Sequence, residues 1–370
     1  MAESRLNVLI TTNIPSPYFV DYADELQNYC DVTVLYELRH AKDRVPEWQR
    51  QKGSRHNAIF LDAKYISDET GLSLKPLKYI KDRKYDRIII ANALTPTGIM
   101  ECLYCRLHRI DYILQSEGGF QGTGKGIKEK FKKFLMEKAR YYLTGMGGDD
   151  DYFLLYGGKK DELRPYPFTS MHKNEIDAEM FAPSEKKLLR NELGIKEPFI
   201  VVSVGRIIPC KGYDILIQAL QQTQTDFGLY IIGGQIPEEY WKLVKEENKG
   251  RIHCVEFCKA DDVRKYYHAA DCFVLATRGD TWGLVINESM AAGLPVITTK
   301  KCVAGCCLIE DDVNGYLVEA DNVEELAQAI CKLHHDEATR FLMGRNNLEK
   351  ISKYTIENMA LQIFNALVRN

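Results

Sequence analysis

Two cations stand five residues apart directly after a predicted strand in the second half of the chain. The run FIVVSVG, residues 199–205, is continuously apolar, which is typical of a strand buried on both faces of a parallel sheet. It ends at Gly205 and is followed by Arg206 and, five residues later, Lys211. A guanidinium fork and an ammonium group at the carboxyl end of a strand can together hold a diphosphate. The alternative interpretation is a pair of solvated surface cations.

Two acids follow the predicted strand at residues 271–277. Asp280 lies in the turn, and Glu288 falls in the next predicted helix, with seven residues between them. Free backbone amides at the start of that helix attract anions. Carboxylates beside an anion-binding helix end fit a sugar nucleotide, whose phosphates take the amides and cations while its hydroxyls donate to the acids. We therefore expect the donor-binding residues to include Thr281, Trp282, Gly283 and Leu284.

A short loop after the predicted strand at residues 251–257 completes this half. It contains Cys258 and Lys259, and it is suited to hold a nucleotide base through its backbone groups.

The elements that position these residues alternate between strand and helix. In the first half, the predicted strands are residues 6–12, 31–37, 85–92 and 111–117. In the second half, they are residues 199–205, 227–234, 251–257, 271–277 and 294–299. This alternation predicts two Rossmann-like, doubly wound α/β domains. Ligands of such sheets bind beyond the carboxyl ends of the strands, which points to loops 13–18, 92–98 and 117–122 in the first domain.

The prolines of RPYPF, residues 164–168, oppose helix and interrupt this alternation. We therefore expect a first domain at residues 1–168 and a second at 169–354, with a C-terminal helix at about 355–370 that packs back on the first. A cleft between two such domains is a usual place for a ligand.

Composition excludes several classes of protein. A formal charge of −3 gives no indication of a nucleic-acid partner. No apolar stretch reaches the length of a membrane span or of a signal peptide's apolar region, and the scattered, odd-numbered cysteines favour reduced thiols, so the sequence predicts a cytoplasmic protein. The CxxC pair at Cys102 and Cys105 and the group at residues 302–307 lack partners for a closed zinc site, and we expect no metal.

A glycine-rich run at residues 145–148 looks like a dinucleotide fingerprint, but it does not follow the first strand of a βαβ unit. The acids at residues 149–151 would also repel a pyrophosphate. A dehydrogenase is therefore disfavoured.

Three blocks, GRIIPCKG, DTWGLVINESMAAGLPV and IEDDVNGYLV, resemble the signature of family-four retaining glycosyltransferases, which have the GT-B architecture of two domains facing a central cleft. The resemblance spans roughly residues 199–335. It implies that Arg206 and Lys211 bind the donor diphosphate, that Glu288 binds the ribose and that Asp280 contacts the transferred sugar. The family usually has Glu where this chain has Asp280. Many members also have a glycine-rich stretch where this chain has residues 304–307. These two differences leave the identity of the donor sugar open.

The first domain resembles bacterial polysaccharide-assembly members of that family through TTNIPSPYFVDYADEL. The resemblance places Asn13 and Ser16 in a first loop over the donor phosphates and the acceptor. It also places Glu117, Gly118 and Gly119 near the reacting centre, where the carboxylate could orient or deprotonate an acceptor hydroxyl. The alternative role of Glu117 is to cap its own loop.

A strongly basic segment follows. Residues 125–140 hold seven cations and two acids, a local charge of +5. We expect one helical stripe of Ile127, Phe131, Phe134, Leu135 and Tyr142 to pack on the sheet. The opposite face presents Lys128, Lys130, Lys132 and Lys133. That face either meets anionic lipid headgroups or the pyrophosphate of a lipid-linked acceptor, or is simply solvated.

The sequence thus predicts a metal-independent, cofactor-free retaining hexosyltransferase that takes a sugar from a nucleotide diphosphate donor, with UDP favoured. Its acceptor is a saccharide or lipid-linked sugar in cell-surface polysaccharide synthesis, and it acts in the cytoplasm, peripherally on the inner face of the membrane. The alternatives are a non-catalytic scaffold of the same fold that binds sugar nucleotides, and a sugar nucleotide epimerase.

Overall fold

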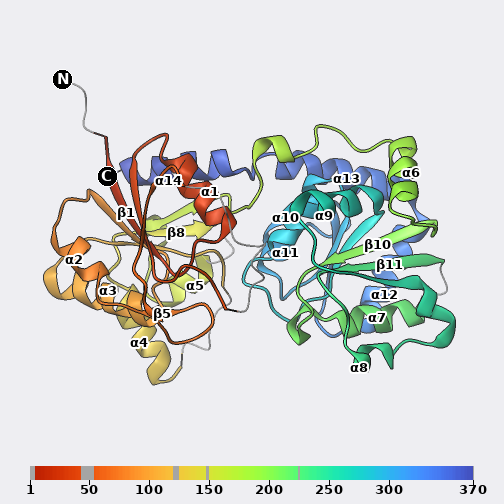
Figure 1. The fold of residues 1–370 in the computed structure, drawn as a ribbon, viewed down its shortest axis with the longest axis horizontal. Coiled ribbons are helices and arrows are strands. Elements are labelled where there is room, and N and C mark those ends of the chain that lie inside the picture. The colour runs from red at the N-terminus through yellow and green to blue at the C-terminus, as the bar shows by residue number, and fades with distance from the viewer. Residues whose placement is uncertain (1–4, 43–53, 120–124, 147–149, 224–225, 370) are drawn as a thin grey trace. The chain divides into compact units, whose positions relative to one another are not determined.

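The structure, a computed structural model, describes residues 5–42, 54–119, 125–146, 150–223 and 226–369. The chain divides into two compact units, residues 1–170 with 355–370 and residues 171–354 (Figure 1). The second unit therefore begins just after the proline-containing segment, and the C-terminal helix belongs to the first unit.

Within the described residues of the first unit, seven parallel strands form one sheet in the order β3-β2-β1-β6-β7-β8-β9. Their bounds are β1 (Asn7–Thr12), β2 (Asp31–Tyr36), β3 (Asn57–Phe60), β6 (Arg87–Ile90), β7 (Ile113–Gln115), β8 (Tyr142–Gly145) and β9 (Leu163–Tyr166). The antiparallel pair β4 (Lys64–Tyr65) and β5 (Gly71–Leu72) stands apart from that sheet. The strand order reverses between β1 and β6, so the loops after these two strands border the crevice where ligands of such sheets bind.

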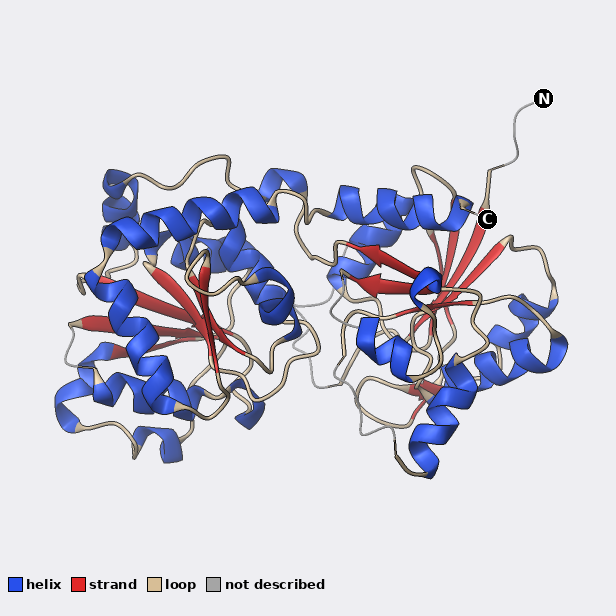
Figure 2. Ribbon diagram, turned by 180° about the vertical axis from the view of Figure 1, so that it is seen from behind, coloured by secondary structure: helices blue, strands red, loops and turns tan. Residues whose placement is uncertain are grey.

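Helices cover both faces of this sheet (Figure 2). They are α1 (Pro17–Leu26), α2 (Pro76–Lys81), α3 (Pro96–His108), α4 (Ile127–Met136), α5 (Asp150–Leu155) and α14 (Ile356–Val368). α14 lies against α1 and β9, with the ring of Phe364 stacked on Tyr29 at 5.4 Å. Arg87 also donates to the carbonyl of Leu367 at 2.9 Å, which ties the last helix to the start of β6.

The second unit repeats this plan. Its described strands run β12-β11-β10-β13-β14-β15, all parallel. They are β10 (Phe199–Val204), β11 (Phe227–Ile232), β12 (Ile252–Val255), β13 (Cys272–Leu275), β14 (Val296–Thr299) and β15 (Gly315–Val318). The order reverses between β10 and β13, which makes the loops after these two strands the walls of this unit's ligand crevice.

The helices of the second unit also lie on both faces of its sheet (Figure 2). They are α6 (Pro183–Glu192), α7 (Tyr213–Gln222), α8 (Glu238–Trp241), α9 (Ala260–Ala269), α10 (Leu284–Ala291), α11 (Val303–Leu308), α12 (Val323–His335) and α13 (Glu337–Ile351). Short 3-10 turns occupy Lys173–Glu175, Pro209–Lys211 and Glu246–Arg251 of this unit, and Lys160–Glu162 of the first unit. β10 and β11 are buried almost throughout, as their unbroken apolar runs predict for central parallel strands.

The interruption expected at residues 164–168 is wrong in part, because Leu163–Tyr166 forms β9. Pro165 lies inside this strand and pairs in register with Thr144. β9 is the edge strand of its sheet, and an edge strand tolerates a proline because one of its sides needs no ladder hydrogen bond.

The expected helical stripe on the basic segment is also wrong. α4 ends at Met136, so Tyr142 lies in β8 instead. Ile127 is 87% exposed, Phe131 43% and Phe134 46%, so of the four stripe residues that lie on α4 only Leu135 is buried. A helical repeat shows which residues share a face, but it does not show which face the rest of the protein covers.

Candidate active site

An ion pair joins the loops that follow β10 and β13 at the switch point of the second sheet. Lys211 Nζ lies 2.5 Å from Asp280 Oδ2. The two side chains are only 18% and 15% exposed, so the pair is largely shielded from solvent. The cation expected to bind diphosphate and the acid expected to contact the sugar are therefore direct neighbours.

Gly212 lets these two loops approach so closely. Its backbone has φ 67°, in the left-handed region that glycine adopts without strain. A Cβ at this position would lie 1.9 Å from the carbonyl oxygen of Ala276, at the end of β13. Any other residue would push Lys211 away from the neighbouring loop.

Arg278 fastens the same two loops. Its backbone N–H donates to the carbonyl of Cys210 at 2.7 Å, and its guanidinium donates to both carboxylate oxygens of Asp214 at 2.9 and 2.7 Å. It also reaches Asp321 Oδ1 at 2.6 Å. Hydrogen bonding to these acids raises the pKa of Arg278 further, so the guanidinium stays charged. Sequence reasoning missed Arg278 because its partners lie 64 and 43 residues away along the chain.

The backbone amides that the sequence predicts to bind anions open α10. Gly283 is its N-cap, with φ 99°, and a Cβ there would lie 2.8 Å from Cys302 Sγ. The Trp282 side chain is buried and donates to Asn287 Oδ1 at 2.8 Å, so it packs inside the unit and offers a ligand its backbone alone. Thr281 is exposed and Leu284 half-buried beside it.

Glu288 lies on α10 and accepts a hydrogen bond from the Tyr267 hydroxyl at 3.1 Å. Tyr267 belongs to α9 and is buried; burial, and then the negative charge of Glu288, raise the pKa of its hydroxyl well above the usual value. Tyr267 therefore stays protonated and donates to the carboxylate. Nothing in the sequence distinguishes this tyrosine from its neighbours on the helix, such as Tyr266.

The other expected donor-site residues lie on the same edge of the second sheet. Gly205 and Arg206 follow β10 directly, and Arg206 is exposed. Cys258 and Lys259 follow β12, where Lys259 is the N-cap of α9. Burial raises the pKa of the Cys258 thiol, which favours its neutral form. The carboxyl ends of three strands thus carry these candidates.

In the first unit, Glu117 follows β7, and its Oε2 accepts a hydrogen bond from the hydroxyl of Tyr18 at the start of α1. Burial raises the pKa of Glu117 to about 7, and the hydrogen bond from Tyr18 partly opposes that rise. Gly118 continues the loop with φ 124°, and Ser116 Oγ donates to its carbonyl at 3.2 Å; Gly119 follows. Residues 120–122 of the loop 117–122 lie outside the described residues. So do residues 147 and 148 of the glycine-rich run and Asp149, the first of the three acids that follow it.

The loop after β1 is held to its neighbours. The Asn13 carbonyl accepts from the Leu38 amide at 2.9 Å. Ser16 is the N-cap of α1 and is buried, and its carbonyl accepts from the Phe19 and Val20 amides at 3.0 Å. Asn13 and Ser16 therefore lie at the carboxyl edge of the first sheet, in the loop that leads from β1 to Tyr18 on α1.

Two buried acids at the same edge escaped sequence reasoning. Glu101 on α3 accepts from Thr11 Oγ1 at 2.6 Å, and burial raises the pKa of Glu101 to about 8. Its other oxygen, Oε1, has no hydrogen-bond partner among the described residues. Glu37, after β2, accepts from Thr95 Oγ1 at 2.6 Å and from the Gly71 amide at 2.8 Å, and burial raises its pKa also. Both acids lie in apolar-looking segments where nothing in the sequence sets them apart.

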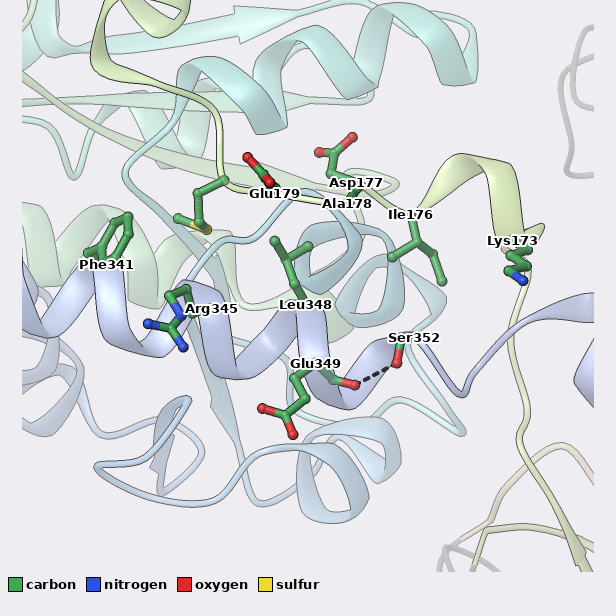
Figure 3. A pocket seen from close by; sticks show the side chains of 11 residues that line it. Lys173, Ile176, Asp177, Ala178, Glu179, Phe341, Arg345, Leu348, Glu349 and Ser352 are labelled. Carbon is green, nitrogen blue, oxygen red and sulfur yellow. Dashed lines mark hydrogen bonds between the residues drawn. The ribbon is translucent and has the colours of Figure 1, made fainter.

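A cavity of about 720 Å³ lies elsewhere in the second unit, and none of the expected donor-site residues lines it. Figure 3 shows its two walls: Arg345, Leu348 and Glu349 extend from α13, and the segment with Asp177 and Glu179 faces them. Asp177 Oδ2 is held by His268 Nε2 at 2.7 Å.

Among the described residues, no three or more His, Cys, Asp or Glu side chains are grouped so that they could hold a metal ion. In the same residues, no helix has both the length and the apolarity that crossing a membrane demands.

Residues 185–355 match the family model described as Glycosyl transferases group 1, and this match contains both β10 and the Lys211–Asp280 pair. An uncharacterised glycosyltransferase of Methanocaldococcus jannaschii is 30% identical over 161 residues, 43% of this chain and 45% of the relative. A D-inositol 3-phosphate glycosyltransferase of Kribbella flavida is 29% identical over 190 residues, 47% of this chain and 44% of the relative. The chain thus spans about half the length of the curated relatives it matches.

Solved structures match over the whole chain. HepE of Anabaena in complex with UDP has a TM-score of 0.77 at 18% identity, covering 98% of this chain and 99% of that one. WaaG, described as a glycosyltransferase involved in lipopolysaccharide biosynthesis, has a TM-score of 0.69 at 16% identity, covering 98% and 100%. The expected α/β architecture is confirmed: the chain has the fold of the GT-B glycosyltransferases.

Proposed function

We propose that this chain is a retaining glycosyltransferase that moves a hexose from a nucleotide diphosphate donor, preferably a UDP-sugar, to a saccharide or lipid-linked acceptor in cell-surface polysaccharide synthesis. The observation that carries the proposal is the Lys211–Asp280 pair, which lies at the switch point of the sheet and within the segment that matches the glycosyltransferase family. The similarity in fold to HepE, solved with UDP and also with UDP-glucose, supports UDP as the nucleotide.

The Lys211–Asp280 pair can bind both parts of such a donor, the anionic diphosphate and the sugar. Lys211 carries three N–H donors, so it can keep Asp280 as one partner and bind a phosphate oxygen with another. Asp280 then accepts from a hydroxyl of the sugar. Because both charges are compensated before the donor arrives, the site holds its geometry without a bound ligand, which is what preorganised catalysis requires.

Bond cleavage then develops negative charge on the leaving diphosphate and positive charge on the sugar. In this proposal Lys211, Arg206 and the amides that open α10 stabilise the diphosphate, and no metal ion takes part. Glu288, with Tyr267 as its fixed donor, accepts from the ribose hydroxyls. The acceptor hydroxyl attacks from the face of the leaving group, and Glu117 orients it or takes its proton.

The basic segment adds a surface fitted to the inner face of an anionic membrane. On α4, exposed Ile127, Phe131 and Phe134 accompany the four lysines 128, 130, 132 and 133. The Arg106 guanidinium of α3 lies 4.0 Å over the Phe134 ring, and Leu107 of α3 is 79% exposed. Apolar side chains beside cations are the features of an interfacial helix. We propose that this surface brings the enzyme to a lipid-linked acceptor.

One experiment tests the reaction itself. Purified protein is incubated with UDP-glucose or another α-linked donor and with a saccharide acceptor, and proton NMR reads the anomeric configuration of the first product. The proposal predicts an α-linked product whose formation a chelator leaves unchanged. A β-linked product would contradict the retaining mechanism, and loss of turnover with the chelator would contradict the metal-free one.

A further inference from the structure

Tyr18 and Glu117 form a polar pair between two loops at the carboxyl edge of the first sheet. Tyr18 lies at the start of α1, after the β1 loop, and Glu117 lies after β7. The Tyr18 hydroxyl donates to Glu117 Oε2, and the two residues are 99 positions apart in sequence. Glu117 Oε1 has no hydrogen-bond partner among the described residues.

The tyrosine ring is itself held in place. Phe168 meets it edge-on, with ring centroids 5.5 Å apart and planes at 84°. Pro17 precedes it at the first position of α1, where the fixed φ of proline favours the start of a helix. A hydroxyl on a ring fixed in this way holds the carboxylate in one orientation.

We propose that Tyr18 is a positioning residue of the transferase: it holds Oε2 of Glu117 and so assigns Oε1 to the acceptor hydroxyl. This inference rests on the proposed function. In the step it serves, the acceptor O–H proton passes to Oε1, and the oxygen uses the freed electron pair to bond the sugar carbon. The electron pair of the breaking sugar–phosphate bond leaves with the nucleotide diphosphate.

The ionisation of the pair agrees with this role. Burial raises the pKa of Glu117 to about 7, while the Tyr18 hydrogen bond lowers it; the carboxylate thus titrates where a general base is effective. Burial, followed by the charge of Glu117, raises the pKa of Tyr18 well above its ordinary value, so the hydroxyl remains a donor. Among the described residues, the other titratable groups that interact electrostatically with the pair are Tyr22 of α1 and Glu69 of the β4–β5 turn.

The chain offers a matched control. Tyr156 also donates its hydroxyl to a glutamate in the first unit, Glu129 of α4. Burial raises the pKa of Tyr156 as well. Tyr156→Phe therefore removes the same kind of hydrogen bond at a place that the proposed reaction does not use.

The first measurement needs no substrate. Side-chain carboxyl signals of ¹³C-glutamate-labelled protein are titrated, with Glu117→Gln used for assignment. Because Tyr18 stabilises the ionised form, Tyr18→Phe should raise the Glu117 midpoint by about half a pH unit or more, and Tyr156→Phe should leave it unchanged. In the wild type, the Tyr18 ring Cζ signal should move with the same midpoint as Glu117, which tests the pair even if Tyr18→Phe fails to fold. An unchanged midpoint in Tyr18→Phe, or independent titration in the wild type, overturns the inference.

The second measurement is the pH dependence of UDP-glucose turnover. The rate should rise with pH through the Glu117 midpoint, and Tyr18→Phe should move that rise to higher pH by the shift seen in the titration. Glu117→Gln should lower turnover by about a hundredfold or more and remove the rise. A Tyr18→Phe profile that coincides with the wild type would overturn the positioning role. Absence of turnover in every variant, wild type included, would instead count against the proposed function and leave the titration result standing.

Discussion

Lys211 and Asp280 lie 69 residues apart in sequence and 2.5 Å apart in space, each the nearest charge of the other at the carboxyl edge of the second sheet. The pair joins the loop that follows β10 to the loop that follows β13. A substitution at either position therefore affects both residues, because removing one partner leaves the other with a partly buried, uncompensated charge.

Lys211→Ala should reduce turnover by about a hundredfold or more, the loss expected when one preorganised donor is removed. Asp280→Asn should also reduce it, and the double variant should lose less than the product of the two single losses, because the residues act together. Steady-state kinetics on the four proteins measures this coupling. Lys300→Ala is the control, since Lys300 pairs with Glu319 at 2.6 Å on an exposed surface. If the rate losses of the two single variants multiply in the double variant, as they do for independent sites, the two residues do not act as a functional pair.

Glu288→Gln should weaken nucleotide binding, because a neutral amide replaces an ionised acceptor for the ribose hydroxyls. Tyr267→Phe should weaken it less, since it removes only the hydrogen bond that fixes Glu288. Calorimetric titration with UDP measures both. Tyr230→Phe serves as control because it breaks a tyrosine–glutamate hydrogen bond of the same length, 3.1 Å to Glu197, away from these loops. Equal affinity in Glu288→Gln and the wild type would remove the ribose role.

The raised pKa of Glu101 predicts that the stability of the folded protein depends on pH. Its pKa is about 8 in the folded protein against an ordinary value of 4.5, so the folded state holds the proton more tightly than the unfolded state. Stability should therefore fall as pH rises from 4.5 to 8. Glu101→Gln should flatten this fall without abolishing it, since the pKa values of Glu37 and Glu117 are raised in the same direction.

Thermal unfolding of the wild type and of Glu101→Gln across pH 5 to 9 measures this difference. The variant should gain most, relative to the wild type, at the alkaline end, where the wild type carries a buried charge. Parallel curves for the two proteins would show that Glu101 has an ordinary pKa.

Neutralising the basic surface of α4 should weaken membrane binding. Each cation near an anionic bilayer contributes about 1 kcal/mol, so changing lysines 128, 130, 132 and 133 to glutamine should lower partitioning by about a thousandfold at low salt. Sedimentation with phosphatidylserine-containing vesicles measures this. The control changes the exposed lysines 187, 242, 245 and 249 of the second unit, with the same loss of charge. Equal binding of both variants, or a wild type that stays in the supernatant, would show that α4 is a solvated face.

The sequence could predict the features that depend on local patterns. Continuous apolar runs located β10 and β11, and the rule that ligand loops follow parallel strands brought Lys211 and Asp280 to one edge. Tyr18, Tyr267 and Arg278 could not be found in this way, because each acts through a partner distant in sequence. The exposed face of α4 was missed for a related reason: periodicity groups Ile127 with Phe131 and Phe134, but only tertiary packing decides whether they are covered.

Ligand-dependent thermal stability shows whether this chain binds a nucleotide diphosphate sugar through Lys211. Melting temperatures are measured with UDP-glucose, UDP-galactose, UDP-N-acetylglucosamine, GDP-mannose and ADP-glucose, for the wild type, Lys211→Ala and the Lys300→Ala control. Binding to the folded state alone raises stability with ligand concentration. We expect at least one donor, with UDP-sugars foremost, to raise the melting temperature of the wild type and of Lys300→Ala but not that of Lys211→Ala. A donor that stabilises Lys211→Ala as much as the wild type, or a panel in which no donor stabilises the wild type, would contradict this expectation.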